Sequence, residues 1–238
     1  TLLSESLQNV DIVIHLASST LPHTSNINPR FDIESNLLAT LNILEASVEK
    51  KVKKLIFISS GGTIYGRPQS VPIHESHPTE PTCSYGIIKL CIEKYISLFH
   101  DLYGLNGIIL RLANPYGERQ RLLHSQGVVP VFLSRAIRGE PLEVWGDGKV
   151  VRDFIYISDV INSILHACIY EGTESVFNIG SGIGLSILEL IDIIKRITHS
   201  PSQVIFKPSR SFDVPTNVLS IDRAMSHLSW KPQINFSE

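Results

Sequence analysis

The sequence predicts an α/β fold, a Rossmann-like three-layer parallel sheet with a smaller C-terminal region. Three short apolar runs rich in β-branched residues, at positions 10–17, 54–59 and 107–112, are typical of buried parallel strands. Segments with helical periodicity separate these runs, which indicates helices packed on the sheet. The chain has 238 residues, of which 43% are hydrophobic, so it is long enough to bury a large core.

Apolar side chains recur at three- and four-residue steps in both segments between the strands. They are Ile33, Leu37, Leu41, Leu44 and Val48 in the first segment, and Leu90, Tyr95, Leu98 and Leu102 in the second. This spacing places them on one face of a helix, so a helix is expected after each of the first two strands. After residue 114, prolines and glycines interrupt the pattern until a predicted strand at 176–179 and a predicted helix at 186–197.

At both ends of the chain, the predicted elements are incomplete. The strand at 10–17 is apolar throughout, yet only one short polar segment precedes it, so a neighbouring strand is expected upstream. The final residues, Ser237 and Glu238, have the composition that opens a helix. We therefore expect a chain that is truncated at both ends.

Composition and charge argue against several classes of function. The formal net charge is −2 and the only dense basic run is 50–54, so no nucleic-acid or membrane partner is predicted. No segment is apolar enough to span a membrane, and the first residues lack a signal-peptide pattern. The cysteines, Cys83, Cys91 and Cys168, have neither metal-ligand spacing nor the density of a disulfide framework, so reduced thiols and a cytoplasmic location are expected. His74 and His77 are the only close histidine pair, and no metal site is predicted.

Tyr85 and Lys89 are the first candidate catalytic residues. They lie four residues apart at the start of a helical pattern, so both side chains project from one helix face. A neighbouring ammonium stabilises a phenolate, and Lys89 is therefore expected to lower the pKa of Tyr85 and make it a general base. Taken alone, the same spacing also occurs on ordinary helix surfaces.

A hydroxyl-rich turn upstream of this pair supplies further candidates. The strand at 54–59 runs directly into it, and such strand ends face the ligand crevice of an open parallel sheet. Ser59, Ser60 and Thr63 are therefore candidates for hydrogen bonds to a ligand. For any one of them, turn formation or capping is the alternative.

A series of motifs extends over nearly the whole chain. They are HLA (15–17), Asn36, NILEA (42–46), YG (65–66), Tyr85 with Lys89, RLANPYG (111–117), GDG (146–148), RDFIYISD (152–159) and NIG (178–180). In this order the series resembles the sugar-nucleotide branch of the extended short-chain dehydrogenase/reductase family, UDP-glucose 4-epimerases and their relatives.

The resemblance implies a role for each matching residue. Tyr85 is the expected general base, and Lys89 is expected to hold the nicotinamide ribose. Thr63 and Ser60 are the remaining catalytic candidates. The cofactor, NAD with NADP not excluded, is expected to contact Leu16, Ala17, Asn36, Ser59, Tyr85 and Lys89. The sugar nucleotide is expected to contact Asn114, Val129, Arg152, Arg210 and Asp213. For Asn114 and Arg152, a structural turn residue and an exposed ion pair are the alternatives.

The same resemblance divides the chain. Residues 1–117 are expected to form a partial NAD(P)-binding Rossmann domain whose first βαβ unit is missing, and residues 118–238 mainly a substrate-binding region, with 151–180 returning to the Rossmann sheet. The family's N-terminal glycine loop has no counterpart before residue 10. The sequence GSGIG at 180–184 does not replace it, because it departs from the G-x-G-x-x-G pattern and the next strand supplies Lys207 instead of an acidic residue.

Two features of the hydroxyl-rich turn narrow the expected activity. The family often carries Ser or Thr where Gly61 stands, so Thr63 or Ser60 is expected to take over that hydroxyl contact. Related sugar 4,6-dehydratases carry an Asp-Glu pair where Gly62 and Thr63 stand, and its absence disfavours dehydration.

The resulting hypothesis is NAD-dependent epimerisation at C4 of a nucleotide-linked hexose, either UDP-glucose and UDP-galactose or an N-acetyl analogue, through a 4-keto intermediate. The alternatives are a nucleotide-sugar 4-ketoreductase and a non-catalytic or inactive fragment that only binds nucleotide sugar. By analogy with the family, a homodimer is expected through the helices that hold Asn36 and Tyr85. Trp145 is expected near the nucleotide base, with a simple hydrophobic anchor as the alternative.

Overall fold

A four-stranded parallel sheet forms the centre of the computed structural model, which describes residues 2–120, 127–209 and 214–236. Its strands are β1 (Ile12–His15), β2 (Lys54–Ser60), β3 (Asn106–Leu112) and β7 (Val176–Ile179), in that spatial order. All four run parallel, with Ser59 of β2 opposite Arg111 of β3. The four strands predicted from the sequence are thus confirmed.

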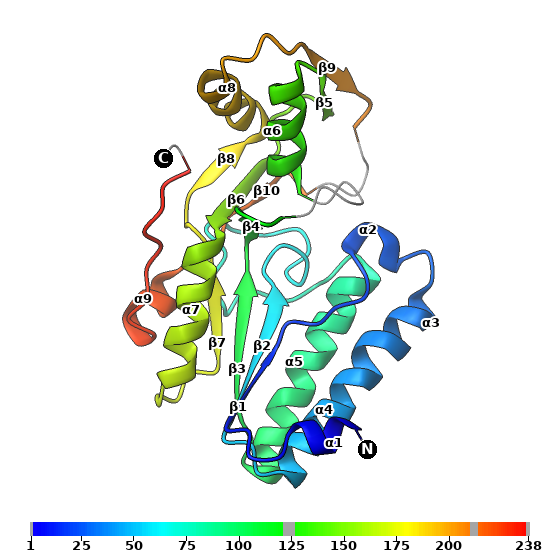
Figure 1. The fold of residues 1–238 in the computed structure, drawn as a ribbon, viewed down its shortest axis with the longest axis vertical. Coiled ribbons are helices and arrows are strands. Elements are labelled where there is room, and N and C mark those ends of the chain that lie inside the picture. Colours follow the sequence, from blue (N-terminus) through cyan, green and yellow to red (C-terminus); the bar gives the residue numbers. More distant parts are fainter. Residues whose placement is uncertain (1, 121–126, 210–213, 237–238) are drawn as a thin grey trace.

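One face of this sheet is covered by the helices that follow β1 and β2 (Figure 1). The first is continuous through α3 (Pro29–Asp32), the π-helical segment η1 (Ile33–Leu38) and α4 (Ala39–Glu49). The second is α5 (Ser84–Tyr103), which ends at Gly104 in the left-handed conformation, φ 72°. Leu44 of α4 and Phe57 of β2 belong to one buried cluster, as the periodicity of the first helix predicts. The face predicted for α5 is wrong: Tyr95, Leu98 and Leu102 are exposed, because the helix carries a second apolar stripe, Ile88, Ile92, Ile96 and Phe99, and this is the one that packs on the sheet.

The opposite face is covered by α7 (Ile157–Ile169) and α9 (Asp222–His227) (Figure 1). Leu110 of β3, Phe177 of β7 and Ala167 of α7 are fully buried there. Trp230 closes the cluster, and its Nε1 atom donates a hydrogen bond to the carbonyl oxygen of Asp159 at 3.0 Å. The sheet therefore lies between two helical layers, which confirms the predicted three-layer α/β fold.

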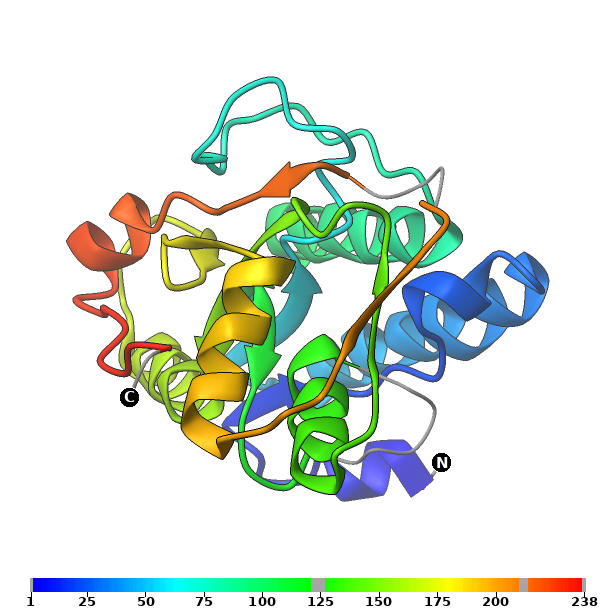
Figure 2. The ribbon, with the colours of Figure 1, turned by 90° about the horizontal axis from the view of Figure 1, so that it is seen from above.

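A second region stands at the carboxyl end of the central sheet (Figures 1 and 2). Its elements are β4 (Asn114–Tyr116), β5 (Leu142–Trp145), β6 (Val151–Tyr156), β8 (Gly184–Ser186), β9 (Val204–Lys207), β10 (Thr216–Asn217), α6 (Val128–Arg138) and α8 (Ile187–Thr198). Strand β6 pairs with β4 and β10 in parallel and with β8 antiparallel, and β5 pairs with β9. The helix predicted at 186–197 is α8, and its Ser186 and Glu189 form a capping box.

The segment 151–180 divides between the two regions. Its first strand, β6, belongs to the second region, whereas α7 and β7 return to the central sheet. The division of the chain into two domains stays a prediction. Two short helices, α1 (Leu2–Ser6) and α2 (Pro22–Ser25), flank β1 in sequence. No helix in the described ranges is long and apolar enough to cross a membrane.

Candidate active site

The first turn of α5 is held by side chains from the segment that follows β1. The backbone N–H of Ser84 donates to Oδ1 of Asn26 at 2.8 Å, and that of Tyr85 donates to Oγ of Ser25 at 3.0 Å. The hydroxyl of Ser84 donates to Oδ2 of Asp32, which is fully buried, at 2.6 Å. These contacts satisfy N–H groups that a helix leaves unpaired at its start, and they fix the position of Tyr85.

Lys89 lies between Tyr85 and the carboxyl end of β2. Its side chain is 5% exposed, and Nζ donates a hydrogen bond to the carbonyl oxygen of Ile58 at 2.8 Å. The ammonium is 5.5 Å from the ring centroid of Tyr85 and 4.6 Å from that of Phe57. The two predicted catalytic residues therefore share one helix face, directed at the end of the central sheet.

Burial decides the protonation of this pair. It raises the pKa of Tyr85 to about 12, and the nearby charges of Cys83 and Asp32 act in the same direction. Burial also lowers the pKa of Lys89 to about 8, against the opposing effect of the Glu93 and Asp32 carboxylates. In the chain by itself the pKa of Tyr85 is therefore raised instead of lowered as expected, because desolvation of the phenolate is the largest influence on it.

His15, at the end of β1, adds no second positive charge. Burial, and then the charge of Lys89, lowers its pKa to about 4, so the imidazole is neutral at pH 7. Its Nε2 atom is 2.8 Å from Oγ1 of Thr40, whose own proton is donated to the carbonyl oxygen of Asn36 at 2.6 Å. Nε2 must then be the donor, which defines the tautomer of His15.

The hydroxyl-rich turn approaches α5 closely at Gly86. A Cβ atom on Gly86 would lie 2.9 Å from the carbonyl oxygen of Thr63, so only glycine permits this contact. Within the described residues, Oγ1 of Thr63 is buried and has no hydrogen-bond partner. A buried hydroxyl without a partner is costly, and this is one signal of a ligand-binding group. Ser60 is half-buried at the last position of β2.

Gly61 has no room for the hydroxyl that the family often carries. A Cβ atom there would lie 2.5 Å from Cδ1 of Leu219, which is fully buried. A Ser or Thr at this position would therefore require Leu219 to move. The packing thus leaves Thr63 and Ser60 as the hydroxyl candidates of this turn.

The predicted cofactor residues divide into two groups. Leu16 and Ala17 are exposed directly after β1, at the carboxyl end of the sheet. Asn36 is buried, and its amide is used within the chain: Oδ1 accepts from the N–H of Ser19 at 2.9 Å, and Nδ2 donates to Oδ1 of Asp32 at 2.8 Å. Asn36 therefore holds the segment after β1 against α3.

Ser59 also makes a contact within the chain. It is 3% exposed, and its hydroxyl donates to Oε1 of Glu93 on α5. Its side chain thus faces the helix layer. Neither Glu93 nor Asp32 was singled out from the sequence, because carboxylates at helical spacing usually indicate a solvated face, and most of their partners lie at least 12 positions away in the chain.

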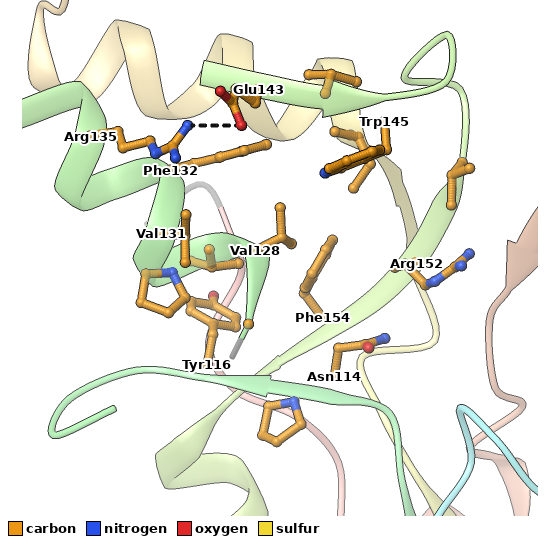
Figure 3. A pocket seen from close by; sticks show the side chains of 17 residues that line it. Asn114, Tyr116, Val128, Val131, Phe132, Arg135, Glu143, Trp145, Arg152 and Phe154 are labelled. Carbon is orange, nitrogen blue, oxygen red and sulfur yellow. Dashed lines mark ion pairs between the residues drawn. The ribbon is translucent and has the colours of Figure 1, made fainter. Parts of the chain in front are cut away.

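A pocket of about 530 Å³ lies in the second region, among β4, α6, β5 and β6 (Figure 3). Its lining includes three predicted substrate residues, Asn114, Val129 and Arg152. Asn114 donates from Nδ2 to the carbonyl oxygen of Asp153 at 2.8 Å, and Nη1 of Arg152 donates to that of Val214 at 2.7 Å. The structure therefore brings together three predicted substrate residues that are separated by up to 38 positions in sequence.

The pocket also contains residues that the sequence did not single out. Arg135 and Glu143 form an ion pair of 3.7 Å at one end, and Phe154 faces the interior (Figure 3). Trp145, 44% exposed, lies on the opposite side from α6. The alternation of β6 could have indicated Phe154, but the pairing of Arg135 on α6 with Glu143 on β5 had no signal in the sequence.

The hydroxyl-rich turn and the pocket are connected through β10. Nδ2 of Asn217 donates to the carbonyl oxygen of Gly61 at 3.1 Å, and Asn217 is opposite Arg152 in the β10–β6 pairing. Tyr85 is not among the residues that line the pocket. The remaining predicted substrate residues, Arg210 and Asp213, lie outside the described residues. In the ranges that the structure describes, no three His, Cys, Asp or Glu side chains gather as a metal site.

Residues 1–180 match the sequence model of the NAD dependent epimerase/dehydratase family. The chain belongs to this family. It is 35% identical over 229 residues to a dTDP-4-dehydro-6-deoxyglucose reductase of Escherichia coli, and the match covers 96% of this chain and 72% of that protein. A UDP-glucose 4-epimerase of Mycolicibacterium smegmatis is 32% identical over 228 residues, covering 96% of this chain and 73% of that protein.

A solved structure agrees with this membership. The UDP-glucose 4-epimerase of Thermotoga maritima, in a crystal structure with UDP-glucose, is 37% identical and superposes with a TM-score of 0.96. The superposition covers 100% of this chain and 77% of that one. The resemblance inferred from the motifs is thereby confirmed at the level of the family.

Proposed function

We propose that this member of the epimerase/dehydratase family inverts C4 of a UDP-linked hexose, or of its N-acetyl analogue, with NAD as the cofactor. The observation that carries the proposal is the Tyr85–Lys89 pair, which is held at the carboxyl end of the central sheet, the end at which the second region with its pocket lined by Asn114 and Arg152 stands. The pocket's volume, about 530 Å³, and its mixture of aromatic and cationic side chains suit a nucleotide with a charged diphosphate.

The residues present fit the nicotinamide end of the cofactor. Within the described residues, Nζ of Lys89 uses one of its three N–H groups, for the carbonyl of Ile58, so two donors remain for ribose hydroxyls. Leu16 and Ala17 offer an exposed apolar surface at the same end of the sheet. NAD, when bound, would supply the hydride acceptor, and its oxidised nicotinamide ring would bring a positive charge to the site.

Tyr85 then acts as the general base in our proposal. It would take the proton of the C4 hydroxyl as the C4 hydrogen leaves as a hydride to NAD, which leaves a keto carbon at C4, and it would return the proton as the hydride comes back to the opposite face of C4. A pKa of about 12 in the chain alone means that Tyr85 needs additional positive charge beside it to work near neutral pH. Thr63 or Ser60 holds the sugar hydroxyl during the transfer.

Calorimetric titration with NAD, in the presence and absence of UDP-glucose, tests the proposal. We expect NAD to bind, and the NAD-loaded chain to convert UDP-glucose into UDP-galactose with no net change in the cofactor's absorbance. A folded chain that binds neither NAD nor UDP-glucose would contradict the proposal.

One relative favours a second candidate function, nucleotide-sugar 4-ketoreduction, because a dTDP-4-dehydro-6-deoxyglucose reductase is 35% identical. The same Tyr-Lys pair serves both reactions, but a reductase consumes its reduced cofactor. Net oxidation of NADH or NADPH with a 4-keto sugar would identify it. UDP-sugar binding without any turnover would instead indicate a non-catalytic binding protein.

Replacing Thr63 by Val tests the hydroxyl contact. We expect turnover to fall by about 10- to 100-fold, the effect of losing one hydrogen bond to a developing charge. Thermal stability is expected to stay equal or rise, because Val keeps the shape and removes a buried hydroxyl that has no partner within the described residues. Ser60→Ala is the matched comparison, and a larger loss of turnover there would assign the contact to Ser60.

We also propose a homodimer through the outer faces of η1, α4 and α5. Leu38 of η1 and Ile87, Leu98 and Leu102 of α5 are exposed apolar side chains on neighbouring helices. Burying them against a second copy removes this surface from water. Sedimentation measurements test the proposal, and a monomer at micromolar concentration would contradict it.

A cytoplasmic location completes the proposal. All three cysteines, Cys83, Cys91 and Cys168, are free thiols and half-buried. Thiols in this state persist in a reducing compartment. Localisation of the tagged protein in cells by microscopy tests the assignment.

A further inference from the structure

Glu93 occupies the helix position four residues after Lys89, on the buried side of α5. It is 4% exposed, and its carboxylate accepts a hydrogen bond from the hydroxyl of Ser59 on β2. It also pairs with Arg111 on β3, whose Nη2 lies 2.7 Å from Oε2 and whose Nε lies 3.1 Å from Oε1 of the carboxylate. Ser59 and Arg111 are opposite each other in the β2–β3 register, so one carboxylate ties α5 to two adjacent strands.

Arg111 continues these contacts into the hydroxyl-rich turn. Its Nη1 donates to the hydroxyl of Tyr65 at 2.9 Å and to the carbonyl oxygen of Glu75 at 3.2 Å. Tyr65, two positions after Thr63, donates in turn to Oδ1 of Asn178 on β7 at 2.7 Å. Arg111 is 6% exposed, and its guanidinium thus connects α5 to the turn inside the protein.

We propose that Glu93 and Arg111 are positioning residues, which set the Tyr85–Lys89 face of α5 against the turn that carries Ser60 and Thr63 and fix a carboxylate one helical turn after Lys89. The inference rests on the proposed function, because it assigns a role in the same site. Neither residue lines the pocket that contains Asn114 and Arg152, and both line a separate pocket of about 490 Å³. In the proposal they act through the groups that they hold.

The electrostatic part of this role follows from what surrounds Lys89. Glu93 on the same helix, Asp32 on α3, the neutral His15 on β1 and the phenol of Tyr85 are the titratable groups that act on it or lie against it. Burial lowers the pKa of Lys89 to about 8, and Glu93 is the strongest opposing influence. Removing the charge of Glu93 must therefore lower the pKa of Lys89 further, so that Lys89 loses its proton at a lower pH.

A buried ion pair is weak evidence for stability by itself. Apolar side chains of similar volume often stabilise a fold equally well. The pair contributes a defined geometry instead, since the planar guanidinium donates hydrogen bonds to a carboxylate, a phenol and a backbone carbonyl in fixed directions.

The variant Glu93→Gln keeps the shape of the side chain and removes its charge. With the lysine side chains labelled with ¹³C and the Lys89 signal assigned through Lys89→Arg, an NMR titration is expected to show the pKa of Lys89 lowered by about 1 pH unit. In the NAD-loaded enzyme we expect kcat for UDP-glucose to fall by about 10- to 100-fold, as for a small misplacement of catalytic groups. KM is expected to stay within about twofold, because substrate binding away from the reacting centre is unchanged. The alkaline limb of the kcat profile should move to lower pH, in step with Lys89.

Asp101→Asn is the control, since it removes one negative charge from an exposed position of the same helix. It is expected to change neither the Lys89 titration nor the pH profile. Should Glu93→Gln fold poorly, the double variant Glu93→Leu/Arg111→Met carries the same expectations without an unpaired buried charge.

An unchanged Lys89 titration and an unchanged pH profile in a folded variant would overturn the proposal, even if its melting temperature were lower. If the Lys89 pKa moves as expected but the wild-type chain has no turnover, the electrostatic role of Glu93 stands and the proposed epimerase activity is what fails.

Discussion

Replacing Tyr85 by Phe is expected to lower kcat for conversion of UDP-glucose by about 10²- to 10⁴-fold, the usual contribution of a positioned general base. The phenol is the group on α5 that can take the C4 proton, and its ring lies 5.5 Å from the ammonium of Lys89. Phe fills the same space without a proton acceptor. The NAD-loaded chain and a coupled assay for UDP-galactose measure the effect.

Tyr95→Phe is the matched control for this experiment. Tyr95 is a 37% exposed tyrosine ten positions later on the same helix, so its replacement should leave kcat unchanged. NAD binding by the Tyr85→Phe variant, followed by calorimetry, separates loss of the base from loss of the cofactor. A kcat within about threefold of the wild type would remove Tyr85 from the proposed mechanism, because a general base contributes far more than that.

Replacing Arg111 by Met is expected to lower the free energy of unfolding by about 3–5 kcal/mol, because it leaves the Glu93 carboxylate buried without its partner. Both side chains are at most 7% exposed, and the pair is 2.7 Å apart. The phenol of Tyr65 also loses its donor from Arg111. Equilibrium unfolding in urea, followed by circular dichroism, measures the change.

Two further variants test whether the unpaired buried charge causes the loss of stability in Arg111→Met. The double variant Glu93→Leu/Arg111→Met is expected to recover most of the stability, since no buried charge remains without a partner. Arg138→Met breaks an ion pair of 2.6 Å whose side chains are 53% and 47% exposed, and it should have little effect. Equal losses from Arg111→Met and Arg138→Met would show that burial of the pair is unimportant.

The sequence by itself determined the fold class of this protein and the candidate residues of its site. Runs of β-branched residues and helical periodicity are local signals, and they predicted β1, β2, β3, β7, α5 and α8. The four-residue spacing of Tyr85 and Lys89 places both on one helix face wherever the helix lies. The order of the motifs identified the family, which the match over residues 1–180 confirms.

Only the tertiary structure decided which groups surround these residues. Burial is a property of the folded chain, and it reversed the expected direction of the Tyr85 pKa. The contact of Glu93 with Ser59 and Arg111 depends on the register of β2 and β3 and on the docking of α5. Hydrogen bonds and ion pairs between segments 18 to 34 positions apart leave no period in the sequence, so a pattern cannot reveal them.

The same reason applies to the hydroxyl-rich turn. The sequence showed that Gly61 lacks the hydroxyl usual in the family, but not that Leu219 fills the space beside it. It showed Thr63 as one hydroxyl among several, whereas packing left Oγ1 of Thr63 buried without a partner among the described residues. Local spacing determined which residues could take part in the chemistry, and long-range packing decided their charge, their partners and the space around them.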